Sequence, residues 1–197
     1  MATFIAYAEL AAKPWKNGGG STTEIAVFPA GAGFEDFDWR ISLATIAHSG
    51  AFSVFPGIDR SLALVAGEGV ALSMDGERRI VLSAANPLVW FPGEAAVEAS
   101  VTSSTTDFNV MTRRSRCRHQ LESIAAPAQL ARCGLTTLLF LAAGAPVTVR
   151  DEGGRAFTLG LYDALLLDGA DAMRWSVDAD ADAADVGATL LVADLIS

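Results

Sequence analysis

The segment at residues 13–23, KPWKNGGGSTT, combines chemical groups that suit a small anion. It holds both lysines of the chain, Lys13 and Lys16, whereas every other strongly basic side chain is an arginine. An ammonium, the Asn17 amide and the N–H groups of three glycines offer several hydrogen-bond donors within a few residues. We therefore expect this segment to close over a bound anion.

A nucleotide phosphate is not the anion that this segment predicts. A Walker-type loop places its lysine after the last glycine and continues into a helix. Here Lys16 precedes Gly18, and the residues that follow, TTEIAV, favour a β-strand. The dinucleotide fingerprint GxGxxG also leads from a strand into a helix, so it does not fit either. The remaining interpretations are a site for another small anion and a flexible turn.

Two predicted strands each carry an arginine on a polar face. Side chains alternate along a strand, so every second residue of FDWRISLATIA and of DFNVMTRR shares a face. The polar faces hold Arg40 with Ser42 in the first segment, and Asn109 with Met111 and Arg113 in the second. In a small barrel one face lines the interior, where an arginine needs a carboxylate partner from the protein or from a ligand.

A third arginine follows a Pro-Gly turn in the segment FSVFPGIDR. Asp59 and Arg60 either pair with each other there or serve a pocket, and an outward, solvated arginine is the alternative. We expect Arg40 and Arg113 to hold a carboxylate through charge-assisted hydrogen bonds. Lys16 and the glycine-loop amides would close over that carboxylate, while Asn109 and Ser42 would orient the uncharged part of the ligand.

Metal and redox chemistry find little support in the residue types. The chain has only two histidines, His48 and His119, so the three histidines and one glutamate of a metal-binding barrel cannot be assembled. The acidic run at 178–185 lacks the glycine and glutamate of a calcium loop, which favours a solvated loop. Cys117 and Cys133 form no CxxC pair and are expected to be reduced. We expect no metal and no cofactor.

Charge and composition exclude several classes of partner. The formal net charge is −9, and 51% of the 197 residues are hydrophobic. A net acidic chain is a poor match for nucleic acid or an anionic membrane. The sequence has no apolar run of about 18 residues for a membrane span, and its N-terminus lacks the pattern of a signal peptide. We therefore expect a globular cytoplasmic protein without a nucleic-acid or membrane partner.

Short apolar or alternating runs divided by Gly, Pro, Asn and Asp extend along almost the whole chain, as in an all-β sandwich or barrel. Residues 119–133 are the best helical candidate, but Pro127 interrupts them, so we interpret them as a connector. A weak repeat matches residues 62–82 to residues 139–159 at a constant shift of 77, since 139 − 62 = 77. The repeat predicts two stacked barrels of similar build.

Four blocks of the sequence resemble the HutD family of bicupin proteins, which is associated with bacterial histidine utilisation. They are PWKNGGGSTTEIA, FDWRISLATIAHSGAFSVFPGIDRSLALVAGEG, FPGEAAVEA and DFNVMTRR. The resemblance implies an all-β bicupin fold, with two tandem cupin barrels of the double-stranded β-helix or jelly-roll type. Residues 1–118 would form the first barrel, with the ligand site. Residues 119–197 would form the second barrel, which completes the core or contributes to an oligomer such as a homodimer.

The resemblance also implies a metal-free pocket for a small anionic metabolite of the histidine pathway, N-formylglutamate or urocanate. The implied role is to limit or tune histidine utilisation. Together with the strand pattern, it gives these candidate ligand-binding residues: Lys16, Asn17, Arg40, Ser42, Asp59, Arg60, Asn109, Met111 and Arg113.

Two other functional classes stay open at this point. The first is a metal-independent isomerase or hydrolase of a small carboxylate, with Glu24, Asp59 or His48 as the general acid or base. The second is a structural scaffold in which the second barrel dimerises. The fold alone does not decide among these classes, because one fold carries many functions.

Overall fold

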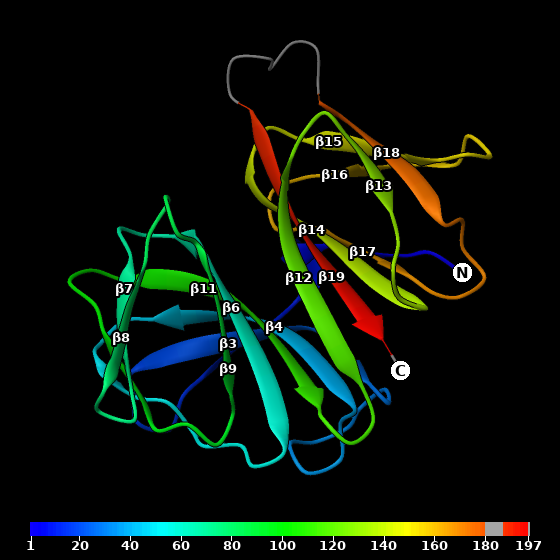
Figure 1. Cartoon of the computed structure of the whole chain (residues 1–197). Helices are drawn as coiled ribbons and strands as arrows, with labels where there is room; N and C mark the ends of the chain where they lie inside the picture. The colour runs from blue at the N-terminus through cyan, green and yellow to red at the C-terminus, as the bar shows by residue number, and fades with distance from the viewer. Residues whose placement is uncertain (180–186, 197) are drawn as a thin grey trace. The chain divides into compact units, whose positions relative to one another are not determined.

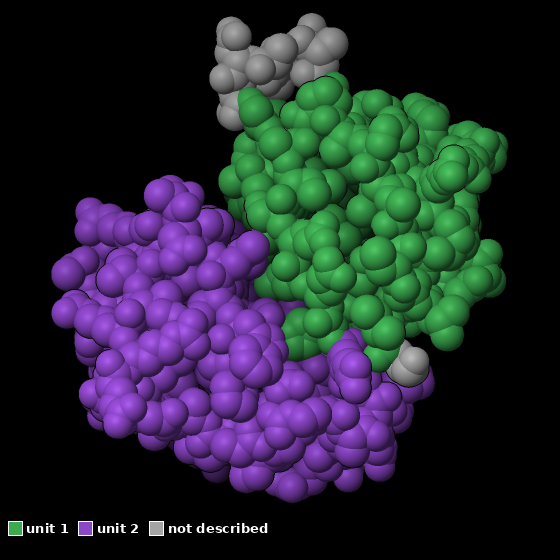
Figure 2. All heavy atoms as spheres, viewed as in Figure 1, with its two compact units in different colours: residues 1–9, 119–197 green, residues 10–118 purple. Residues whose placement is uncertain are grey.

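The computed structural model describes residues 1–179 and 187–196, and the regular secondary structure of these residues is β-strand with one exception. The exception is a short 3-10 helix, η1 (Tyr7–Glu9), and nothing helical in the described part is long and apolar enough to cross a membrane. Most of the acidic run at 178–185 lies outside the described residues. The chain divides into two compact units, shown in different colours in Figure 2. We call residues 10–118 the cavity unit and residues 1–9 with 119–197 the companion unit.

The cavity unit consists of two antiparallel sheets. The six-stranded sheet has the order β2 (Ala12–Pro14), β3 (Gly20–Phe28), β4 (Trp39–Ile46), β11 (Thr105–Arg113), β6 (Ile58–Ala66) and β9 (Leu88–Pro92) (Figure 1). The four-stranded sheet has the order β5 (Gly50–Ala51), β10 (Val97–Ser100), β7 (Val70–Met74) and β8 (Arg78–Leu82). Buried Leu62 and Phe91 of the first sheet pack with Leu72 and Leu82 of the second. These contacts make the unit a two-layer sandwich.

The companion unit repeats this plan with its own core. Its five-stranded sheet has the order β1 (Thr3–Ile5), β17 (Ala164–Leu167), β14 (Thr136–Gly144), β19 (Ala188–Ile196) and β12 (Arg118–Ala125). Its four-stranded sheet has the order β13 (Ala128–Ala131), β18 (Arg174–Ala179), β15 (Val147–Asp151) and β16 (Ala156–Leu159). Trp175 from the smaller sheet packs with Leu139 and Leu190 from the larger one, and all three are buried.

The N-terminal residues belong to the companion unit, whereas the sequence analysis placed residues 1–118 together. Thr3 on β1 is in register with Leu166 on β17. The Ala2 N–H donates a hydrogen bond to Asp171 Oδ1 at 2.8 Å. These contacts connect residues 1–9 to a distant part of the chain, so the cavity unit begins at Leu10.

The predicted connector at residues 119–133 is wrong, because the structure forms two strands there. Strand β12 ends at Ala125 and β13 begins at Ala128, so Pro127 lies between two strands. Ile124 and Leu130 both pack against the companion unit's core. Burial of these apolar side chains favours the extended structure over an irregular link.

The 77-residue repeat corresponds to equivalent strand pairs. Val70 is in register with Leu82 in the cavity unit, and Val147 with Leu159 in the companion unit. The aligned glycines Gly67 and Gly144 have φ values of 100° and 94°. A Cβ atom on Gly144 would lie 2.0 Å from a backbone carbonyl oxygen, so this position requires glycine for close packing as well as for its backbone angle.

Candidate functional site

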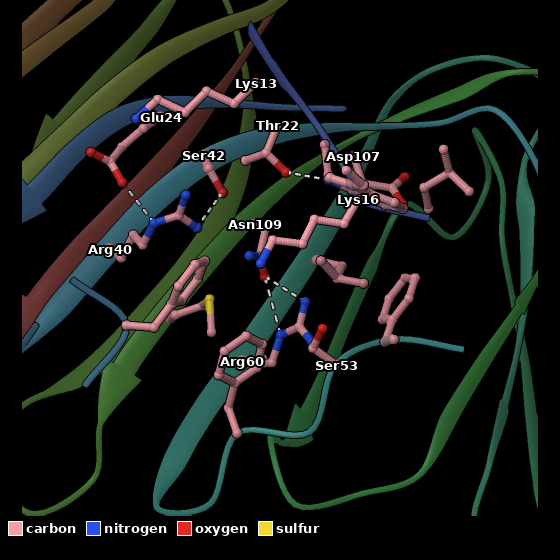
Figure 3. Close-up of a pocket in the computed structure, with 18 of the residues that line it drawn as sticks. Lys13, Lys16, Thr22, Glu24, Arg40, Ser42, Ser53, Arg60, Asp107 and Asn109 are labelled. Carbon is pink, nitrogen blue, oxygen red and sulfur yellow. Dashed lines mark hydrogen bonds and ion pairs between the residues drawn. The ribbon is translucent and has the colours of Figure 1, made fainter. Parts of the chain in front are cut away.

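The cavity unit encloses a cavity of about 810 Å³ beside its six-stranded sheet (Figure 3). Strand alternation sends every second side chain of β4, β6 and β11 toward this cavity. The strands contribute Arg40, Ser42, Ala44, Ile46, Arg60, Leu62, Asp107, Asn109 and Met111. Strand β3 adds Thr22 and Glu24, and residues from the segments at 13–17, 31–34 and 51–55 complete the lining.

Two arginines flank the same residue of the central strand β11. Met111 is in register with Arg40 on β4 and with Arg60 on β6. Residues in register across antiparallel strands point to the same face, so both guanidinium groups enter the cavity from one row. The adjacent row on this face brings Ser42 beside Asn109.

Arg60 is buried without a carboxylate partner. The residue is 8% exposed, and its side chain forms no ion pair with any residue that the structure describes. Nε and Nη2 each donate to Asn109 Oδ1 at 3.4 Å, which is long for a hydrogen bond. The guanidinium carbon lies 5.1 Å from the ring centre of Phe91 and 5.3 Å from that of Phe52. Burial and the charge of Arg40 lower the pKa of Arg60 to about 10, so it stays protonated at neutral pH.

Arg40 already has a carboxylate partner inside the cavity. Its Nε donates to Glu24 Oε2 at 2.8 Å, and its Nη1 donates to Ser42 Oγ at 3.4 Å. The guanidinium also lies 5.0 Å from the ring centre of Phe34. The ion pair fixes Arg40 at the cavity wall and leaves Nη2 without a hydrogen bond to any described residue.

The glycine loop is a tight turn that uses its own N–H groups. Gly18 N–H donates to Trp15 O at 3.0 Å, and Gly19 N–H donates to Asn17 Oδ1 at 3.0 Å. These two amides are therefore already engaged, in contrast to the expectation that the loop's N–H groups close over an anion. The loop instead contributes the side chains of Lys16 and Asn17 to the cavity lining.

Two of the predicted site residues lie outside the cavity lining. Asp59 Oδ1 accepts a hydrogen bond from Arg114 Nη2 at 2.7 Å. It precedes Arg60 on the same strand, so its side chain points to the opposite face. Arg113 donates to the backbone carbonyls of Phe37 and Glu35 at 3.0 and 2.8 Å. The structure thus joins Arg40 with Arg60 in the cavity, in place of the expected Arg40 and Arg113.

Asp107 was missed by the sequence analysis although its strand was selected. It shares the cavity face of β11 with Asn109 and Met111, as alternation in DFNVMTRR would have shown. Its side chain is 0% exposed, and neither carboxyl oxygen has a hydrogen-bond partner among the described residues. Burial raises the pKa of Asp107 to about 7.

Both carboxyl groups of the cavity adjoin irregularities in the sheet. The register of β3 and β4 shifts between Glu24 and Ala26, and that of β11 and β6 shifts between Thr106 and Asp107. Such bulges often lie next to functional sites, because they redirect individual side chains. His48 does not line the cavity, and the described residues contain no group of three or more His, Cys, Asp or Glu side chains arranged to hold a metal ion.

The fold and this cavity define a cupin-like all-β protein. A cupin 2 conserved barrel domain protein from Leptotrichia buccalis has a TM-score of 0.60 at 11% sequence identity, covering 99% of this chain and 96% of that chain. At this identity the likeness concerns the fold alone.

The chain belongs to the HutD family, whose model matches residues 7–184, and this family is associated with histidine utilisation. An uncharacterized 21.2 kDa protein in the hutC 3' region of Pseudomonas putida is 38% identical over 159 residues, or 80% of this chain and 82% of that protein. HutD from Pseudomonas fluorescens SBW25 has a TM-score of 0.82 at 31% identity, and a conserved protein of unknown function from Pseudomonas aeruginosa PAO1 has a TM-score of 0.89 at 28% identity. Each of these two comparisons covers 100% of this chain and 100% of the solved structure.

Proposed function

We propose that this protein binds a small carboxylate metabolite of histidine utilisation in the cavity, without a metal, and thereby tunes the pathway. The observation that carries the proposal is Arg60, a buried guanidinium that forms no ion pair with a described residue. Burying an unpaired charge is costly, so such groups are expected to find a partner. A ligand carboxylate would supply that partner from the cavity side.

The surroundings of Arg60 favour a carboxylate over a neutral ligand. Four cationic side chains line the cavity, namely Lys13, Lys16, Arg40 and Arg60. Of the two carboxyl groups in the lining, Glu24 is paired with Arg40 and Asp107 has its pKa raised to about 7. The aromatic rings around Arg60 restrict the guanidinium plane, which favours recognition of a planar anion.

Family membership points to the class of metabolite. Histidine utilisation passes through small carboxylates, and N-formylglutamate and urocanate are the two candidates that we propose. Holding such an intermediate would let its concentration regulate the pathway in the cytoplasm. This role needs reversible binding but no chemical step.

Calorimetric titration of the purified protein with N-formylglutamate and urocanate tests the proposal. We expect saturable binding of at least one ligand with a stoichiometry of one per chain. A metabolite panel monitored by thermal unfolding extends the test to other carboxylates. Absence of binding across the panel would contradict the proposed function and favour a structural scaffold.

The enzyme alternative rests on one specific observation, the buried carboxyl of Asp107 in the same cavity as Glu24. A carboxyl whose pKa is near 7 suits general acid or base catalysis at neutral pH. Incubation of each ligand with substoichiometric protein, followed by NMR, separates the two functions. Conversion of more ligand than protein would establish an enzyme, whereas unchanged ligand supports binding alone.

A further inference from the structure

We propose that Asp107 selects ligands that carry an N–H donor at the end remote from their carboxylate. This inference rests on the proposed function, because it assigns the second end of the ligand held by the arginines. It makes the ligand class an N–H-bearing carboxylate, such as one with an imidazole ring, rather than a carboxylate with an apolar end.

The cavity has two chemically different ends along strand β11. Met111, between Arg40 and Arg60 in register, marks the cationic end. Asp107 lies four residues earlier on the same face, which separates the two backbone positions by about 13 Å at roughly 3.3 Å per residue. Asn109 lies between them, and Figure 3 shows Asp107 on the far side of Asn109 from both arginines in that view.

The neighbouring strands give Asp107 no polar partner. On β11 it is in register with Ala44 of β4 and with Leu64 of β6, and both of these side chains are apolar. Thr22 of β3 is in register with Ala44; its hydroxyl accepts a hydrogen bond from Trp15 Nε1 at 2.8 Å, and no hydrogen bond joins it to Asp107.

Lys13 and Lys16 are the cations that line the cavity from the glycine-loop segment, and Asn109 is the adjacent polar residue on the same strand face. No hydrogen bond or ion pair joins any of them to Asp107 in the described part of the chain. A partner for the carboxyl group is therefore expected from the cavity.

The chemistry of a carboxyl group specifies that partner. Its oxygens accept hydrogen bonds whether or not the group is protonated, so an N–H donor satisfies Asp107 in either state. A second ligand carboxylate at this end would face repulsion or would have to share a proton. An apolar ligand end would leave the buried oxygens unpaired, which costs affinity.

Urocanate and cinnamate form a matched pair for the test, because they share a propenoate carboxylate and differ in the imidazole or phenyl ring. We would titrate both calorimetrically at about pH 8, where a free imidazole is neutral. The wild-type protein is expected to bind urocanate at least about tenfold more tightly than cinnamate. Asp107→Leu should reduce this ratio to near one, while Asp107→Asn should keep most of it because its amide oxygen still accepts.

Two outcomes would overturn the inference. One is a wild-type ratio near one, as expected if a cavity water satisfies Asp107, and this result does not depend on the folding of any variant. The other is a ratio that persists in Asp107→Leu, or in Asp107→Ala if the leucine variant does not fold. If N-formylglutamate binds while urocanate and cinnamate have equal affinities, the inference is refuted but the proposed function is not. Absence of binding for all three ligands would refute the proposed function as well.

Discussion

Arg60 donates two hydrogen bonds of 3.4 Å to a single atom of Asn109, its Oδ1. These long contacts do not compensate a buried positive charge, and no carboxylate in the described residues does so. Arg40, in the same row, has a partner in Glu24 at 2.8 Å. The contrast explains why Arg60 is the residue on which anion binding is expected to depend.

The first prediction concerns the stability of the ligand-free protein. Arg60→Met is expected to leave the free energy of unfolding unchanged or to raise it by about 1–2 kcal/mol, because it removes a poorly compensated buried charge. Chemical denaturation of both proteins measures the difference. A loss of more than about 3 kcal/mol would instead assign Arg60 a structural role.

The second prediction concerns Arg113, which lies outside the cavity lining. Arg113→Gln should lower the free energy of unfolding by about 1–3 kcal/mol, because the carbonyls of Phe37 and Glu35 lose their donors. Arg116→Gln is a matched control, since that exposed arginine pairs with Asp38 and should contribute less than about 1 kcal/mol. Ligand affinity should change less in Arg113→Gln than in any Arg60 variant, and the reverse order would contradict the assignment.

The third prediction concerns pH. The pKa of Asp107 rises from 3.8 to about 7 on folding, so the folded state holds its proton between these values while the unfolded state releases it. Stability therefore falls as pH rises through this window, by about 4 kcal/mol at most at 1.4 kcal/mol per pKa unit. Asp107→Asn removes the effect. Thermal unfolding should show that the variant gains more stability relative to wild type at pH 8 than at pH 4.5. Equal gains at the two pH values would contradict the prediction.

The fourth prediction concerns the glycine loop. A Cβ atom on Gly20 would lie 2.2 Å from Thr45 O, so Gly20→Ala must displace the loop or the neighbouring strand. We expect a loss of more than about 2 kcal/mol, comparable to other strained or overpacked sites. Gly18 has a φ of 71° but open space around it, so Gly18→Asn should lower the free energy of unfolding by only a few tenths of a kcal/mol. Denaturation midpoints of the two variants would show this order.

Strand alternation was enough to predict part of the site. It correctly grouped Arg40 with Ser42, and Asn109 with Met111, because the period of a strand fixes which side chains share a face. The same rule predicts opposite faces for Asp59 and Arg60 but does not specify which face is buried. That choice depends on contacts with distant residues, including Phe52 and Phe91 around Arg60.

Other features required contacts that no local pattern reveals. Arg113 shares a strand with Asn109, but carbonyl groups 76 and 78 residues away engage its side chain. Apolar and polar residues alternate only weakly along the sequence of β12, so its pairing within the companion unit decides its structure. The burial of Asp107 likewise arises from the packing of separate strands, so its raised pKa is a property of the fold.

The central claim is that Arg60 supplies the cation for a bound carboxylate. Calorimetric titration of wild type, Arg60→Gln and the control Arg114→Gln with urocanate and N-formylglutamate tests it most directly, since Arg114 pairs with Asp59 and Glu94 and does not line the cavity. We predict that Arg60→Gln weakens binding by at least about tenfold, as loss of a charge-assisted contact requires, while Arg114→Gln binds like wild type. Equal affinities for wild type and a folded Arg60→Gln would contradict the claim.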